Sequence, residues 1–137
     1  MSLDFDSARL PNNALTSEHH EWRAQLRRFF DREVIPYAEE WDENGAIPDE
    51  LWPKSAAVGI LGLGFPEEFG GITEGIDIWH SIILNEEMAR IAVGGIAATL
   101  MVHGIGLPPV INFGSEAIKQ LVAPPVLAGA KRISLAI

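Results

Sequence analysis

Apolar residues recur with a helical period in the first third of the chain. They follow at spacings of three and four and so share one stripe of a helix: Trp22, Leu26, Phe29 or Phe30, and Val34. The hydroxyl of Thr16 or Ser17 is suited to cap the first turn, and Pro36 predicts a stop or kink. A second helical stretch then runs to Asn44-Gly45, which is a strong C-terminal cap signal.

Four further helices are predicted over residues 48–58, 77–92, 95–105 and 115–129, the last interrupted by the Pro124-Pro125 pair. The glycine-rich passage at 59–71 predicts an ordered loop. Residues 91–113 contain no Asp, Glu, Lys or Arg, yet their glycines and prolines favour a buried helix broken once over a membrane span. The sequence therefore predicts an all-α domain, orthogonal or up-down, of about five to six helices.

The last seven residues follow a different pattern. Ile133, Leu135 and Ile137 alternate with smaller residues, as in a half-buried β-strand. Nothing earlier offers a partner strand, and a lone strand with an apolar face is not stable. We therefore expect the chain to be the amino-terminal piece of a longer protein that continues into a β region.

Composition narrows the function classes. The 137 residues are 47% hydrophobic and 21% charged, with 10 basic against 19 acidic residues and a net charge of −9. This acidity argues against a nucleic-acid or anionic-membrane partner, and the absence of cysteine excludes disulfide scaffolds and thiol chemistry. The acidic start carries no signal or transit pattern, so a cytoplasmic location is expected.

Few residues suggest catalytic or metal chemistry. Gly62-x-Gly64 lacks the frame of a dinucleotide turn. His19 and His20 are expected to be exposed, and Asp77 with His80 is interpreted as a helix cap beside a surface histidine, so no metal site is predicted. His103 is interpreted as a core histidine bonded to backbone, with a pocket residue as the alternative.

Two other features stay open between a structural and a functional reading. Glu86-Glu87 or Glu67-Glu68 could supply a general base if buried with a raised pKa, but pairing with Arg90 on one helix face explains the first pair more simply. Ala98, Met101, Val102 and Ile105 share one helix face at i, i+3, i+4 and i+7. Such a stripe is either core or the wall of a slot for an alkyl chain.

Several passages, in this order and spacing, resemble the amino-terminal helical domain of the acyl-CoA dehydrogenases. They are Leu15-Thr16, Ile35-Pro36, Glu40-Trp41-Asp42, Leu51-Trp52, residues 62–71, Glu86-Glu87-Met88-Ala89-Arg90, Phe113-Gly114-Ser115-Glu116 with Lys119, and Ala128-Gly129. The resemblance implies a flexible leader at 1–14, a helical domain at 15–130 and the start of a truncated β-barrel domain at 131–137. It also implies a homo-oligomeric enzyme that passes electrons to an electron-transfer flavoprotein.

The same resemblance implies the chemistry and the site. In the family, a carboxylate takes the α-proton of an acyl-CoA and FAD accepts the β-hydride; that carboxylate lies outside this chain, so no catalytic residue is assigned and the chain alone is expected to be inactive. Leu135 and Ile137 are expected to meet the flavin. The expected acyl pocket is Ala97, Ala98, Met101, Val102 and Ile105. Alternatives are a related flavin monooxygenase, a nitroalkane-oxidase-like enzyme, or a non-catalytic helical interaction module.

Overall fold

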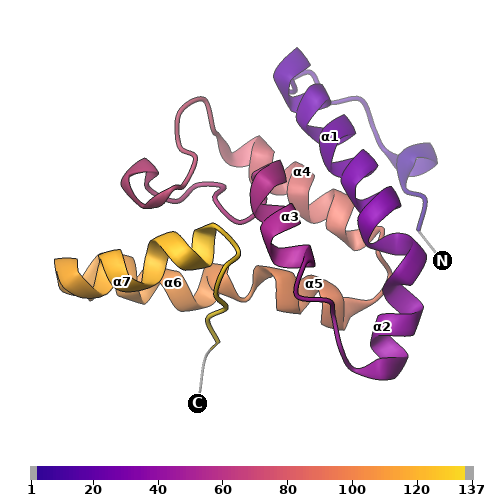
Figure 1. Ribbon diagram of the computed structural model, residues 1–137. Helices are drawn as coiled ribbons and strands as arrows, with labels where there is room; N and C mark the ends of the chain where they lie inside the picture. Colours follow the sequence, from indigo (N-terminus) through magenta and orange to yellow (C-terminus); the bar gives the residue numbers. More distant parts are fainter. Residues whose placement is uncertain (1–2, 135–137) are drawn as a thin grey trace. The chain divides into compact units, whose positions relative to one another are not determined.

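The computed structural model describes residues 3–134, and this part of the chain is helical with no β-strand (Figure 1). Three short 3-10 helices are η1 (Asp6–Ala8), η2 (Ile35–Tyr37) and η3 (Glu67–Phe69). The α-helices are α1 (Ser17–Glu33), α2 (Ala38–Asn44), α3 (Leu51–Val58), α4 (Ile78–Ala89), α5 (Gly94–Met101), α6 (His103–Phe113) and α7 (Glu116–Leu127). The predicted all-α class is confirmed.

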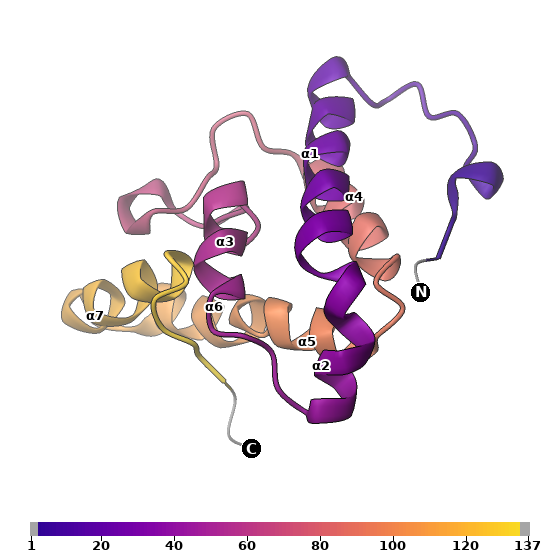
Figure 2. The same cartoon turned by 45° about the vertical axis from the view of Figure 1, so that its right-hand side comes forward.

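The chain divides into two compact units. The first consists of residues 1–47 and 77–97, and the second of residues 48–76 and 98–137. In the first unit α1 and α4 pack side by side, and both views show this pairing (Figures 1 and 2). Its buried apolar residues come from both helices and from the segments that follow them: Leu26, Phe29, Phe30, Val34, Ala38, Ile83, Leu84, Met88, Ile91 and Ile96.

Local signals explain the helix boundaries in the first unit. Thr16 caps α1 by accepting a hydrogen bond from the backbone of His19, and Asp77 caps α4 in the same way. Pro36 ends α1 through the 3-10 turn η2, after which α2 continues to Asn44. Gly45 adopts the left-handed conformation, with φ of 62°, that closes α2. These four boundaries agree with the sequence predictions.

The second unit is built on α6 and α7, which lie against each other (Figure 2). Its core cluster combines Phe69, Leu107, Ala123, Val126 and Leu127. The loop before α4 is held by a bridge between Leu63 and Ile72. A Cβ atom at Gly71 would lie 2.0 Å from the carbonyl oxygen of Phe65, so only glycine fits there.

Three predictions about α5–α7 were wrong. The Pro124-Pro125 pair does not interrupt the last helix, because both prolines lie inside α7. The apolar stretch was expected to be buried, but within Gly94–Phe113 only 22% of its most apolar part is buried. The predicted helix end at Ile105 was also wrong, because α6 extends to Phe113. The stretch is broken once, as expected, and the break lies at Val102, while Pro108 and Pro109 lie inside α6.

The segment after α7 crosses α3 closely. Gly129 has a φ of 72°, and a Cβ atom there would lie 2.4 Å from the carbonyl carbon of Trp52. Arg132 stacks its guanidinium 4.5 Å from the centre of the Trp52 ring and also binds Asp49. Residues 131–134 are not in a strand, and because the remaining strand residues lie outside the described part, the expected strand stays a prediction.

Candidate functional site

The predicted pocket residues lie along α5 and the start of α6. Ala97 is the last residue of the first unit. The other four share one apolar surface of the second unit, which we call the outer apolar face: Ala98, Met101, Val102 and Ile105. Ala98 is exposed and the Ile105 residue is 63% exposed, while Ala97, Met101 and Val102 are half-buried. The opposite positions of the same helices are buried, namely Ile96, Leu100, His103 and Leu107. Ala98 and Ile105 are therefore not core residues, whereas Met101 and Val102 are partly covered.

His103 lies beneath the outer apolar face and is 5% exposed. Its Nδ1–H donates a hydrogen bond to the carbonyl oxygen of Leu100, 3.0 Å away. Desolvation lowers the pKa of His103 even though the backbone hydrogen bonds to Leu100 and Leu61 oppose this. The interpretation as a core histidine bonded to backbone is confirmed, and burial favours the neutral form of the ring.

A small hollow next to His103 is lined by Trp52, Leu61, Val126 and Ile133. Its cavity volume is about 10 Å³, which is room for about one water molecule. A flavin ring system needs a pocket of several hundred Å³, on the order of 300–1,000 Å³, so this hollow does not fit one. The predicted flavin contacts, Leu135 and Ile137, lie outside the described residues and stay a prediction.

Two of the four carboxylates considered as bases, Glu67 and Glu87, have the wrong properties for that role. Glu87 is buried, and although desolvation raises its pKa, hydrogen bonds from Arg27 and Arg23 outweigh this and lower it. Hydrogen bonds from the Thr73 hydroxyl and the Glu74 backbone lower the pKa of Glu67. A general base at neutral pH needs a raised pKa, so both groups are structural carboxylates.

The arginine partners of Glu87 were only partly predicted. The expected pair with Arg90 is present, with Nη1 3.3 Å from Oε2. Arg23 and Arg27 of α1 also donate to Glu87, at 3.1 Å and 2.8 Å. These two arginines are four residues apart and share one face of α1. This spacing is the sequence signal that could have predicted a buried acidic partner for both.

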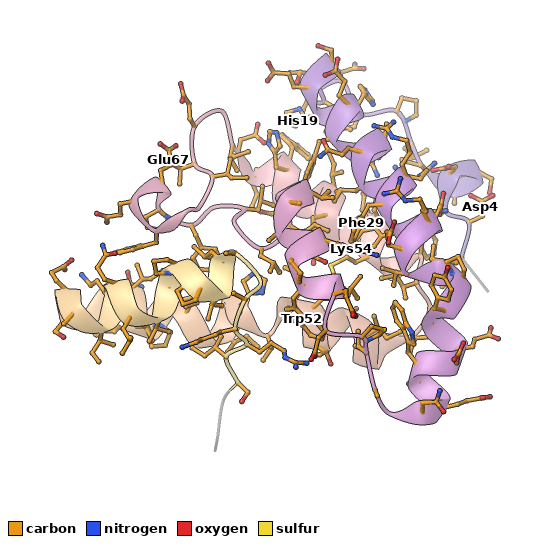
Figure 3. All side chains as sticks on the ribbon, viewed as in Figure 1. Asp4, His19, Phe29, Trp52, Lys54 and Glu67 are labelled. Carbon is orange, nitrogen blue, oxygen red and sulfur yellow. The ribbon has the colours of Figure 1, made fainter. Side chains whose placement is uncertain are left out.

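Three polar side chains meet where α1 and α4 begin. The His19 and His80 residues, expected to be exposed, are only 4% and 7% exposed, so those predictions were wrong. Asp77 Oδ1 lies 2.9 Å from His19 Nε2 and 2.9 Å from His80 Nδ1. Desolvation raises the pKa of Asp77, but the hydrogen bonds from His19 and His80 outweigh this effect and bring the pKa down to about 2. Figure 3 marks His19 on the first turn of α1.

Comparison with known proteins gives a consistent family match. Residues 16–130 match the family described as acyl-CoA dehydrogenase, N-terminal domain. The long-chain specific acyl-CoA dehydrogenase, mitochondrial, of Rattus norvegicus is 38% identical over 115 residues, which cover 83% of this chain and 26% of that protein. Since residues 16–130 include it, the segment Gly94–Phe113, which by length and composition could cross a membrane, is part of this domain.

Solved structures agree with this match. An acyl-CoA dehydrogenase from Bacillus anthracis complexed with FAD has a TM-score of 0.72 and 32% identity, covering 90% of this chain and 21% of that chain. An acyl-CoA dehydrogenase from Geobacillus kaustophilus has a TM-score of 0.70 and 29% identity, covering 88% and 31%. The chain spans about a quarter of the length of the curated relatives it matches.

Proposed function

Because the chain belongs to the acyl-CoA dehydrogenase family, as its N-terminal domain, we propose that it forms the substrate-facing helical part of a flavin-dependent acyl-CoA dehydrogenase. The reaction is α,β-dehydrogenation of an acyl-CoA thioester. The match over residues 16–130 supports the family, and the outer apolar face supports the assignment of this part of the chain to the acyl group.

The outer apolar face is the observation that carries the proposal. A helix that leaves Ile105 63% exposed keeps apolar area in water unless another apolar group covers it. Ala98 is small and Met101 is flexible, so a linear alkyl chain can lie along the face without a fixed shape being required. The face has no charged side chain that would have to be desolvated.

FAD, when bound, accepts the hydride from the β-carbon. The residues of this chain contribute by holding the acyl group and excluding water. The α-proton goes to a carboxylate outside the chain, which agrees with the lowered pKa values of Glu67 and Glu87. Residues 1–137 expressed alone are therefore expected to be inactive, because the carboxylate that takes the α-proton is not among them.

The partners follow from the same proposal. Acyl-CoA is the substrate, and an electron-transfer flavoprotein is the expected acceptor of the electrons. A homo-oligomer and a cytoplasmic location, both expected from the sequence, stay predictions.

An anaerobic titration tests the proposal. Protein expressed from the complete reading frame should carry bound flavin, and saturated acyl-CoA should bleach its absorbance without added reductant. A related flavin monooxygenase would instead need prior reduction and oxygen, and a nitroalkane-oxidase-like enzyme would be bleached by nitroalkanes. A folded protein without flavin would contradict the proposal and favour a non-catalytic helical module.

A further inference from the structure

The cluster of His19, Asp77 and His80 in the first unit has the composition of a metal site. One ligand atom from each residue lies within 4.8 Å of the other two. Both imidazoles are buried, whereas the side chain of Asp77 is 48% exposed. An ion can therefore reach the cluster from solvent, and water can complete its coordination.

The three ligand atoms converge on one place. Asp77 Oδ1 lies 2.9 Å from His19 Nε2 and 2.9 Å from His80 Nδ1. An imidazole that carries its proton on the facing nitrogen donates it to this carboxylate. A cation that replaces those protons meets the same three atoms, because metal ligands bind in their deprotonated form.

We propose that His19, Asp77 and His80 bind a divalent first-row transition ion such as Zn²⁺. Two imidazole nitrogens and one carboxylate oxygen suit this class of ion and disfavour Mg²⁺ and Ca²⁺, which prefer oxygen ligands. Ligands on a tetrahedral zinc ion lie about 3.3–3.5 Å apart. The two 2.9 Å contacts of Asp77 Oδ1 therefore need only small side-chain shifts.

The existing hydrogen bonds can rearrange to allow binding. When His19 uses Nε2 as a ligand, its proton moves to Nδ1, which then donates to the Thr16 hydroxyl oxygen 3.1 Å away. The backbone N–H groups of Thr16 and Asp77 lose their imidazole acceptors. Both residues are exposed, so water replaces the lost acceptors.

Glutamine substitutions separate metal binding from helix capping. Both histidines occupy the third helical position of a capping box, where glutamine is a preferred residue. His19→Gln and His80→Gln therefore keep the cap and remove the metal ligand. Asp77→Asn is a third variant, since asparagine also caps well but coordinates weakly. His20→Gln is the matched control because His20 is the exposed neighbour on α1.

Calorimetric titration of Zn²⁺ into metal-free protein from the complete reading frame provides the test. The unmodified protein and His20→Gln should bind one equivalent of Zn²⁺ at this site. The three ligand variants, His19→Gln, His80→Gln and Asp77→Asn, should lack that equivalent or bind it at least about tenfold more weakly. Zn²⁺ should also raise the unfolding temperature of the first two proteins alone. Equal Zn²⁺ binding by all five proteins, or none by the unmodified protein, would overturn the proposal. The test is independent of flavin and acyl-CoA.

Discussion

Glu87 is a buried carboxylate surrounded by arginines of its own unit. Its side chain is fully buried, while those of Arg23, Arg27 and Arg90 are 12%, 29% and 13% exposed. A buried charge is tolerated only when it is paired and fully hydrogen-bonded. The carboxylate therefore ties α1 to α4, and the partly exposed arginines keep their remaining N–H groups hydrated.

Replacing Glu87 with glutamine should lower the free energy of unfolding by about 3 kcal/mol, because the arginines lose the charge that compensates their burial. The pH dependence should change as well. The pKa of Glu87 is lowered from an ordinary value of 4.5, so its contribution is present above pH 4.5 and is lost as the pH falls through the folded value. In denaturant unfolding measured from pH 7 to pH 3, the free energy of unfolding of Glu87→Gln should fall less steeply at acid pH than that of the unmodified protein.

Glu86→Gln is the matched control for this prediction. Glu86 is the preceding residue, and its side chain is 40% exposed while paired with Arg23. A partly exposed ion pair contributes less than about 1 kcal/mol. Equal losses of stability in the two variants would show that burial of the carboxylate is not what matters.

At this scale the sequence predicted contacts between neighbours along one helix but not contacts across helices. The pair of Glu87 with Arg90 follows from helical spacing alone. His19 and Asp77 are 58 residues apart, and no periodicity links residues on separate helices. Each histidine has only acidic or capping residues as sequence neighbours, and these neighbours predict an exposed side chain.

Among the elements, α7 departs most from its sequence pattern. Pro124 and Pro125 lack the N–H groups that would bond the carbonyls of Gln120 and Leu121. Both of those residues are exposed, so water can satisfy their carbonyls. Burial of Ala123, Val126 and Leu127 in the core cluster keeps the helix continuous past the prolines.

Pro124→Ala should therefore raise the free energy of unfolding by about 1 kcal/mol, because it restores one helical hydrogen bond and removes a steric conflict. The gain is limited by the greater freedom of alanine in the unfolded chain. Pro48→Ala is the control, since Pro48 is exposed and precedes α3. The control should be neutral or slightly destabilising in thermal melts, and a destabilised Pro124→Ala would contradict this account.

Helix starts were predictable from the sequence, whereas helix extents were not always so. Caps are local, and Thr16, Asp77 and Ser115 occupy the N-cap positions of α1, α4 and α7. A proline inside a helix is decided by the packing on either side of it, which is a tertiary property. The extension of α6 through Pro108 and Pro109 has the same origin, because Leu107 is buried in the core cluster.

For the whole molecule, the central claim is that the outer apolar face contacts the acyl group of a CoA thioester. The spacing of these residues predicted that they share one helix face, but it did not predict whether that face is buried or exposed. The same spacing serves core and pocket alike, and only the packing of Leu100 and Leu107 on the opposite side decides which face is buried.

Two matched variants test that claim most directly. The residues Ile105 and Leu121 are 63% and 64% exposed, but only Ile105 belongs to the outer apolar face. In anaerobic titrations of flavin-loaded protein with a long-chain acyl-CoA, Ile105→Glu should raise the concentration for half-bleaching at least about tenfold, because a buried charge would face the alkyl chain. Leu121→Glu should titrate like the unmodified protein. Identical titrations for both variants would contradict the account.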